Sequence, residues 1–369
     1  MIKKGNGTQE AQEAQERNKQ HKRYVLLVSF LCLLCFLGSG PRSPASAQNR
    51  APRVVAIGDI HGDLDAFAGI LQRTRLADPS RRWAGGNSIL VQTGDFLDRG
   101  PEARAVMDLL MSLQKDAPRQ GGRVIVLMGN HEAMNIYGDL RYVTSSDYSS
   151  FADDRSDSRR KKPDPSHSAG FLERCDALDA GGKYGKWLRT LPAIARVNDS
   201  IFLHGGINPD LAASSIDQLN DAIAGEIKAF DSYKQYIIEK KIAQPCATLD
   251  ELTAAARAAL DKAKGKDAET LKAFLGYGSW LSINENGPLW FRGYAQWTDA
   301  EGAPYLQRLT EAFGASRFVV GHTPQAGGQI VPRFDGKVYL IDTGMLSTYF
   351  SGGHASALNI QDGKISFIY

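Results

Sequence analysis

The sequence predicts an α/β protein built on a largely parallel sheet, and two observations carry this prediction. From residue 53 onward, short and fully apolar runs alternate with stretches of helical periodicity, and the first three runs end in the polar clusters "GDIHG", "GDFLDRG" and "GNHE". Fully apolar strands separated by helices are typical of a sheet that βαβ crossovers bury on both faces. Because ligands bind beyond the carboxyl ends of such strands, we expect the three clusters to line one edge of the sheet.

The predicted elements follow one another in a regular order. Strands are expected at 53–57, 88–92 and 123–128, with helices near 64–76 and 101–115 between them, and further strands at 200–204, 317–322 and 337–344. The polar, proline-containing stretch at about 144–168 is expected to be a loop insertion. Residues 210–275 have helical composition and periodicity, which predicts a helical cap.

The first 47 residues have the order of an export signal. The basic segment "NKQHKR" precedes the apolar run from Tyr24 to Leu37, and small residues follow at Ala45 and Ala47. A helix of 14 residues spans only about 21 Å, short of a bilayer core of about 30 Å. We therefore expect a signal peptide at 1–47 that is cleaved, a domain at 48–369, a periplasmic or secreted location and no stable membrane association. An uncleaved membrane anchor is the alternative, because the segment before the apolar run is long.

Charge and cysteine content narrow the class of protein. The chain has 369 residues with 43% hydrophobic content, which suffices for one large core or two modest ones. Residues 1–47 contain seven Lys or Arg and three Asp or Glu, which leaves 37 basic and 38 acidic residues and argues against a nucleic-acid surface. Cys175 and Cys246 remain after cleavage. An oxidising compartment permits a disulfide between them, although their spacing supplies no geometry.

Histidines at strand ends indicate a metal site. A single Asp-x-His could be turn chemistry, with Asp63 capping the next helix. Several such residues lie at predicted strand ends beside glycines: Asp59, His61, Asp95, Asn130, His131, His204 and His322. They supply the oxygen and imidazole ligands suited to two divalent ions, and the absence of cysteine from these clusters argues against a structural zinc site.

The ordered motifs "GDIHG", "GDFLDRG", "GNHE", "HGG" and "GHT", spread over residues 58–323, resemble the calcineurin-like metallophosphoesterase superfamily. The second and third are similar to motifs of the phosphoprotein phosphatase group. Within that group, "GPLWFRGY" and "IDTGMLSTYFSGGHASAL" resemble the bacterial Shewanella-like protein phosphatases. The resemblance covers nearly all of 48–369 and implies a four-layer α/β/β/α sandwich with a helical insertion.

The resemblance also implies two metal ions, of Mn, Fe or Zn. It assigns one ion to Asp59, His61 and Asp95, and lets Asp95 bridge to a second ion held by Asn130, His204 and His322. A bridging carboxylate holds two cations about 3.5–4 Å apart, and a hydroxide between them would attack phosphorus directly.

The resemblance assigns the remaining site residues to the phosphoryl group and its leaving oxygen. Arg99 and Arg292, together with Asn130, match phosphate-binding positions, and a guanidinium fork suits phosphoryl oxygens. His131 is the expected general acid, oriented by Asp98. For His354 both a place in the pocket and a structural role stay open.

The implied function is a metal-dependent phosphomonoesterase, a protein phosphatase for phosphotyrosine, phosphoserine/threonine or both. Met128 stands where protein Ser/Thr phosphatases usually carry Arg, and their C-terminal loop sequence is absent, so the preferred residue stays open. A phosphorylated protein or a small phosphomonoester is the expected partner. The alternatives are a small-molecule phosphatase or dinucleoside polyphosphate hydrolase, and a non-catalytic phosphate-binding relict.

Overall fold

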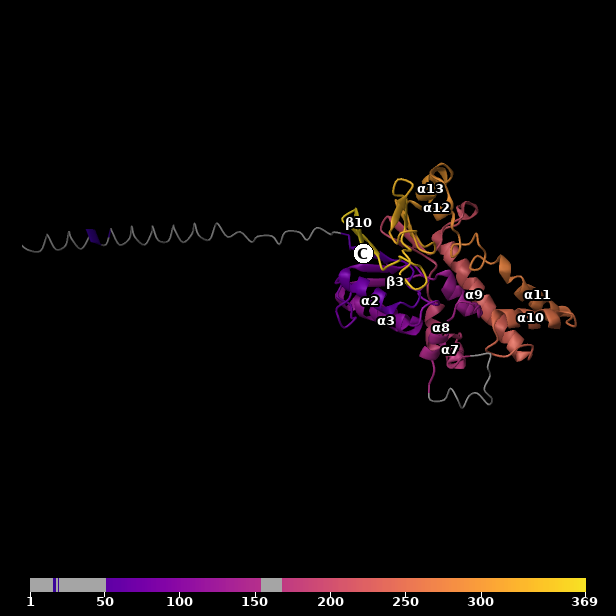
Figure 1. The fold of residues 1–369 in the computed structure, drawn as a ribbon. Helices are drawn as coiled ribbons and strands as arrows, with labels where there is room; N and C mark the ends of the chain where they lie inside the picture. The colour runs from indigo at the N-terminus through magenta and orange to yellow at the C-terminus, as the bar shows by residue number, and fades with distance from the viewer. Residues whose placement is uncertain (1–15, 18, 20–50, 154–167) are drawn as a thin grey trace, which may run out of the picture. The chain divides into compact units, whose positions relative to one another are not determined.

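Two mixed five-stranded sheets lie at the centre of residues 51–369 in the computed structural model (Figure 1). The structure describes residues 16, 17, 19, 51–153 and 168–369. Apart from residues 16, 17 and 19, the predicted signal peptide with its cleavage site after Ala47 lies outside the described residues, as do residues 154–167 of the predicted polar loop. None of the helices in the described part reaches the length and apolarity needed to cross a membrane.

The first sheet combines the three predicted N-terminal strands with a C-terminal hairpin, in the order β10-β9-β1-β2-β3. Its strands are β1 (Val54–Ile57), β2 (Ile89–Gln92), β3 (Arg123–Val126), β9 (Ala357–Gln361) and β10 (Lys364–Ile368). β1, β2 and β3 are parallel, as predicted. β9 runs antiparallel to β1 and pairs Ile360 with Val54; this hairpin was not predicted.

The second sheet has the order β4-β5-β6-β8-β7 and is also mixed. Its strands are β4 (Ile194–Val197), β5 (Ser200–Leu203), β6 (Arg317–Val320), β7 (Val331–Arg333) and β8 (Val338–Leu340). β5, β6 and β8 are parallel, while β4 and β7 pair antiparallel at the edges. The parallel strands are the three that the sequence predicts in this half of the chain.

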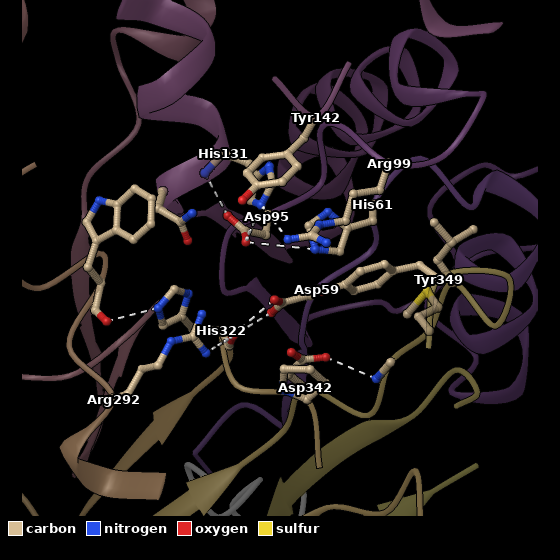
Figure 2. A pocket seen from close by; sticks show the side chains of 16 residues that line it. Asp59, His61, Asp95, Arg99, His131, Tyr142, Arg292, His322, Asp342 and Tyr349 are labelled. Atoms are coloured by element: carbon tan, nitrogen blue, oxygen red, sulfur yellow. Dashed lines mark hydrogen bonds and ion pairs between the residues drawn. The ribbon is translucent and has the colours of Figure 1, made fainter. Parts of the chain in front are cut away.

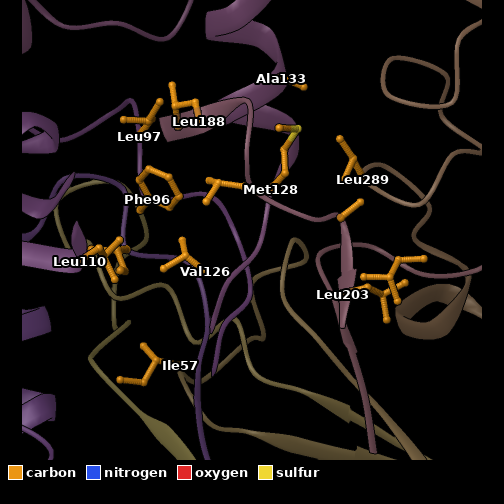
Figure 3. Packing of buried hydrophobic residues seen from close by; sticks show 14 of the residues in the cluster. Ile57, Phe96, Leu97, Leu110, Val126, Met128, Ala133, Leu188, Leu203 and Leu289 are labelled. Carbon is orange, nitrogen blue, oxygen red and sulfur yellow. The ribbon is translucent and has the colours of Figure 1, made fainter. Parts of the chain in front are cut away.

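Alternate side chains along the inner strands pack into two separate hydrophobic cores. Val54 and Ala56 of β1 share an apolar cluster with Phe202 of β5 and Val319 of β6, between the sheets. Their neighbours along the strands belong to the main core with the helices, part of which Figure 3 shows. The expectation that helices cover both faces is therefore wrong, because the second sheet covers one face of the first. The four-layer sandwich implied by the resemblance is confirmed.

Helices α2 (Leu64–Arg73) and α3 (Ala103–Asp116) make the crossovers of the first sheet. The Asp63 carboxylate accepts a hydrogen bond from the Ala66 N–H and caps α2, so the capping role considered for it is confirmed. α3 leads through the 3₁₀ turn η1 (Ala117–Gln120) into β3. Both helices bury one apolar face, which positions the loops that precede them.

Short helices follow β3, in a stretch where the sequence lacked a clear pattern. They are α4 (Asn130–Tyr137), α5 (Ser145–Ser150), α7 (Phe171–Leu178) and α8 (Lys183–Leu188). α5 begins inside the predicted polar loop because the Thr144 side chain caps it through the Asp147 N–H.

The segment 210–275 is mainly helical and projects to the right of the sheets in Figure 1. After the 3₁₀ turn η2 (Pro209–Leu211) it contains α9 (Ile216–Glu239), α10 (Leu249–Leu260) and α11 (Gly265–Leu275). A disulfide joins Cys175 of α7 to Cys246, just before α10. The remaining helices are η3 (Tyr277–Ser279), α12 (Gly293–Gln296) and α13 (Asp299–Phe313).

Candidate active site

The predicted site residues meet in one pocket at the carboxyl ends of the parallel strands (Figure 2). Those that line it are Asp59, His61, Asp95, Arg99, Asn130, His131, Arg292 and His322. His204 and Asp98 lie just behind, fully buried, in contact with lining residues. Residues from six segments of the chain, separated by up to 263 positions, thus come within contact distance.

The Asp95 carboxylate lies between two groups of imidazoles. Its Oδ2 atom is 3.1 Å from His204 Nε2, 3.9 Å from His61 Nε2 and 3.8 Å from His131 Nε2. Two sets of buried metal-ligand atoms share it, namely His61–Asp95–His131 and Asp95–His204–His322. Asn130 adds an amide oxygen 2.9 Å from His204 Nε2. One carboxylate is therefore placed to serve two cations.

Backbone carbonyls fix the tautomers of three of these histidines. His61 Nδ1 lies 2.9 Å from the Leu97 carbonyl, His204 Nδ1 2.9 Å from the Thr93 carbonyl, and His322 Nε2 2.9 Å from the Trp290 carbonyl. Since a carbonyl only accepts, each of these nitrogens carries a proton and the other ring nitrogen presents a lone pair.

Burial keeps two of these rings, those of His61 and His322, neutral. It lowers the pKa of His61 to about 3, with His131 contributing, and together with His204 it holds the pKa of His322 well below its usual range. Neutral imidazoles with inward lone pairs, joined by carboxylate and amide oxygens, fit divalent cations. The donor set thus matches the two-metal prediction.

The backbone at the site adopts a conformation that side chains disfavour. Five non-glycine site residues have φ between +49° and +69°: His61, Asp95, Asp98, Arg99 and His322. The left-handed region costs a non-glycine residue on the order of 1 kcal/mol. Surrounding contacts hold these turns, as when Glu132 accepts backbone N–H bonds from Asp95, Phe96 and Leu97 at 2.7–3.1 Å.

Two glycines make room for the ligand carboxylates. A Cβ atom at Gly321 would collide with the Asp59 carboxylate, and one at Gly129 would collide with the Asp95 carboxylate. Both glycines therefore allow the main chain to lie directly against a predicted metal ligand, which explains their places in "GHT" and "GNHE".

His131 and Asp98 form a buried dyad. His131 Nδ1 lies 2.7 Å from Asp98 Oδ2, and the opposite nitrogen, Nε2, faces the pocket 3.3 Å from an Arg99 nitrogen. Burial by itself would lower the pKa of His131, but Asp95 and Asp98 raise it above its ordinary value. This arrangement suits a proton donor whose orientation is set by a carboxylate.

The two predicted phosphate-binding arginines reach the pocket from opposite sides in the view of Figure 2. Arg292 donates to the His322 carbonyl at 2.8 Å and to Thr323 Oγ1 at 3.0 Å. The Arg99 guanidinium lies 3.9 Å from the ring centre of Tyr349 and 4.7 Å from that of Tyr142, and its buried Nε has no hydrogen-bond partner among the described residues. Arg99 thus retains a donor for an anionic ligand.

Sequence analysis missed several residues of the site. Asp342 lines the pocket beside Asp59, and burial raises its pKa to about 6. It follows the apolar run of β8 and precedes Gly344 by two residues, a signal similar to the one that identified Asp59. Tyr142 and Tyr349 at the pocket mouth follow no such pattern. Tyr349 lies within "IDTGMLSTYFSGGHASAL", but nothing in that stretch indicates that its side chain lines the pocket.

Two residues that the sequence singled out lie elsewhere. The Met128 side chain is fully buried in the main core, so the position usually occupied by Arg in Ser/Thr phosphatases does not face the pocket (Figure 3). His354 is exposed and packs its ring against Tyr369, 5.4 Å between centres. It is not among the residues that line the pocket.

Clusters of buried Asp and His sharing one carboxylate, set at the loop edge of a two-sheet sandwich, are the features of a metal-dependent phosphoester hydrolase. The model of the calcineurin-like phosphoesterase family matches residues 52–326, and the chain belongs to this family. Its relatives include phosphatases, and its buried ligands are able to bind two metal ions.

Two curated relatives and one solved structure are similar to this chain. Shewanella-like protein phosphatase 1 of Plasmodium berghei is 28% identical over 86% of this chain and 74% of its own length. Shewanella-like protein phosphatase 2 of Arabidopsis thaliana is 34% identical over 48% of this chain and 52% of its own. The solved structure of a cold-active protein-tyrosine phosphatase of a psychrophilic Shewanella species superposes with a TM-score of 0.58, at 25% identity, over 86% of this chain and 81% of that chain.

Proposed function

We propose that this enzyme removes phosphoryl groups from phosphorylated proteins, with phosphotyrosine as its best substrate. The observation that carries the proposal is the pair of tyrosines around Arg99. Tyr142 and Tyr349 are 39% and 46% exposed and flank a guanidinium at the pocket mouth. An aryl phosphate that reaches the buried carboxylates would lay its ring against these side chains. The similar Shewanella structure is named a protein-tyrosine phosphatase, and the Plasmodium relative is named a protein phosphatase, which supports phosphorylated proteins as the substrate class.

The proposed roles of the metal ligands follow their geometry. Asp59, His61 and Asp95 would hold one metal ion, and Asp95, Asn130, His204 and His322 the other. When bound, the two ions supply Lewis-acid activation of water and of the phosphoryl group. The ligand atoms of His131, His61 and Asp95 lie close enough together to hold one metal ion. If His131 is a proton donor, His131→Asn should keep its bound metal; if His131 is a ligand, the variant should lose metal.

The remaining residues bind the substrate and move one proton. Arg99 and Arg292 donate to the phosphoryl oxygens, and Asn130 adds its amide beside them. His131 donates the proton on Nε2 to the leaving oxygen, while Asp98 holds the opposite side of the ring. Because Arg99 contacts both the tyrosines and His131, it places the phosphoryl group next to the proton donor.

Phosphate release from matched peptides tests the function. Peptides that differ only in phosphotyrosine or phosphoserine, together with diadenosine tetraphosphate, are compared at equal loading with Mn²⁺, Fe²⁺ or Zn²⁺. We expect the highest kcat/KM on the phosphotyrosine peptide, and a selective loss of that preference in Tyr142→Ala/Tyr349→Ala. Tyr305, exposed and remote from the pocket, supplies the control Tyr305→Ala. Equal rates on both peptides, or an unchanged ratio in the double variant, would contradict the preference.

A small-molecule hydrolase is the second candidate. A symmetrical bis(5'-nucleosyl)-tetraphosphatase of Neisseria meningitidis is 25% identical over 49% of this chain. Turnover confined to diadenosine tetraphosphate would favour this candidate. Metal binding without turnover of any substrate would instead indicate a phosphate-binding relict.

We also propose that the protein is exported and that its mature form begins at Gln48. The order of the N-terminal segments supports this proposal, as does the Cys175–Cys246 disulfide, because disulfides persist in oxidising compartments. Cell fractionation followed by N-terminal sequencing tests it. An intact Met1 in the membrane fraction would favour the uncleaved anchor.

A further inference from the structure

A buried guanidinium lies behind the His131–Asp98 dyad, on a residue that belongs to none of the sequence motifs of the family. Arg174 of α7 is 2% exposed and donates through Nε to Asp147 of α5 at 2.8 Å. Arg174 does not line the pocket. Its other branch points toward the active site.

A chain of hydrogen bonds links Arg174 to the proposed proton donor. Arg174 Nη2 donates to Asn135 Oδ1 at 2.7 Å, and Asn135 Nδ2 donates to Asp98 Oδ1 at 2.9 Å. The second oxygen of Asp98 lies 2.7 Å from His131 Nδ1. The four side chains are contributed by α7, α4 and the loop after β2.

Arg174 fits the direction of this chain of hydrogen bonds. A guanidinium has donors only, so it must face the carbonyl oxygen of the Asn135 amide and not its NH₂ group. The NH₂ group is thereby turned toward Asp98, where it occupies one carboxylate oxygen and leaves the other for His131. Asn135 Nδ2 also donates to the His131 carbonyl at 2.8 Å, so the two acceptors on this side of the amide agree with the donor on the other side.

Charge supports the same conclusion. Asp98 and Asp147 are both fully buried, and Arg174 faces both of them, with Nη2 3.8 Å from Asp98 Oδ1. Buried carboxylates without a compensating cation or full hydrogen bonding are strongly disfavoured. Arg174 therefore stabilises the ionised form of Asp98, the carboxylate that is hydrogen-bonded to the His131 imidazole.

We infer that Arg174 is a positioning residue for the reaction: through Asn135 and Asp98 it fixes the His131 ring with Nε2 toward the leaving oxygen. This inference rests on the proposed proton-donor role of His131. A purely structural Arg174, which only ties α7 to α5 through Asp147, would change stability without selecting among leaving groups.

The test compares Arg174→Gln with Arg174→Lys, which keeps a donor-only side chain. For Arg174→Gln we expect kcat to fall about tenfold or more on a phosphoserine peptide and less than about threefold on p-nitrophenyl phosphate, with KM nearly unchanged, because a poor leaving group depends most on the general acid. Arg174→Lys should recover a large part of the loss. Bound metal is quantified in each variant.

A matched control removes a similar ion pair away from the site. Arg189 of α8 binds Asp231 of α9 through two hydrogen bonds of 2.7 and 2.8 Å. Arg189→Gln should lower the unfolding temperature and leave the ratio of rates on the two substrates unchanged. If Arg174→Gln fails to fold, Asn135→Ser carries the test, because it breaks the same chain and keeps the Arg174–Asp147 pair.

A second readout needs no activity. In the proton NMR spectrum of the metal-free protein, the Nδ1–H proton bonded to Asp98 should give a downfield signal that His131→Asn removes. We expect Arg174→Gln to broaden or shift it and Arg189→Gln to leave it in place. Should His131→Asn slow all substrates equally, the proton-donor role fails, while this signal still reports whether Arg174 positions the ring.

Double variants test whether Arg174 acts through Asp98. Adding Arg174→Gln to Asp98→Asn should cost almost nothing further in kcat, since the two residues act along one path. An equal loss on both substrates, an unperturbed His131 signal, or fully additive effects with Asp98→Asn would overturn the inference.

Discussion

The loops that carry the site and the helices of the cap follow opposite rules. In the loops, His61, Asp95 and His322 take left-handed backbone conformations. In the cap, α9 and α10 begin at reciprocal capping boxes, such as Thr248 with Glu251. The site loops adopt locally disfavoured conformations so that polar groups converge, while α9 and α10 of the cap begin with residues that are locally favoured at helix starts. Substitutions in the loops should therefore cost activity, and substitutions in the cap should cost stability.

The largest effect is expected at Asp95, where both proposed metal sites meet. Asp95→Asn should lower kcat by about 10³-fold or more, because it weakens two sites at once. Arg292→Ala should lose less, since it removes one phosphate contact. Metal analysis and kcat for both variants check this prediction, and similar residual rates with full metal content in each would contradict the two-metal reading. Unfolding of metal-free Asp95→Asn should show no loss of stability.

The cap should show the reverse behaviour when its disulfide is removed. Cys175 and Cys246 are 71 positions apart, and closing a loop of this length stabilises by about 4 kcal/mol in the chain-entropy account. The double variant Cys175→Ser/Cys246→Ser should lose stability of this order, measured by denaturant unfolding, and keep kcat within about threefold. A large loss of kcat at a temperature where the variant is fully folded would show that the two regions are coupled.

His131 should show an effect that depends on the substrate. His131→Asn is expected to slow phosphoserine peptides most, by about 100-fold, phosphotyrosine peptides less and p-nitrophenyl phosphate least, because the basicity of the leaving oxygen falls in this order. Asp98→Asn should follow the same order more weakly. Metal content should stay unchanged, and its loss in His131→Asn would assign His131 to the ligands instead.

The smallest effect is expected at the cap of α10. Thr248→Ala removes the side-chain oxygen that accepts from the Glu251 N–H, which should cost about 1 kcal/mol of stability. Thermal unfolding and kcat measured together check it. A change in kcat without a change in stability would contradict the expectation that cap substitutions affect stability and not activity.

The same division explains what the sequence could predict. β1, β2 and β3 were found within two residues of their ends because fully apolar runs and glycine-rich turns mark them. Most of the site was found because its residues directly follow those runs. Apolar runs also predicted the parallel strands of the second sheet, but their arrangement in a separate sheet came from family resemblance alone, since an apolar strand looks the same whether a helix or another sheet covers it.

The network behind His131 could not be found in this way. Asn135, Asp147 and Arg174 lie on three short helices, and nothing in their spacing indicates that they meet. Long-range side-chain bonds between helices leave no periodic signal. The contact of Tyr349 with Arg99 was missed for a related reason, because the two residues are 250 positions apart in the sequence.

The pairing of β1 with β9 has a consequence for how the enzyme forms. β1 leads directly to Asp59, yet one of its two neighbours in the sheet comes from the far end of the chain, and the hydrogen bond from Arg53 to Asn359 spans 306 positions. Contacts of such high sequence separation make folding slow, and an unpaired β1 edge is exposed to other chains in the meantime. We therefore expect the hairpin β9–β10 to close the first sheet late in folding, and a chain that lacks it to present β1 as an aggregation-prone edge.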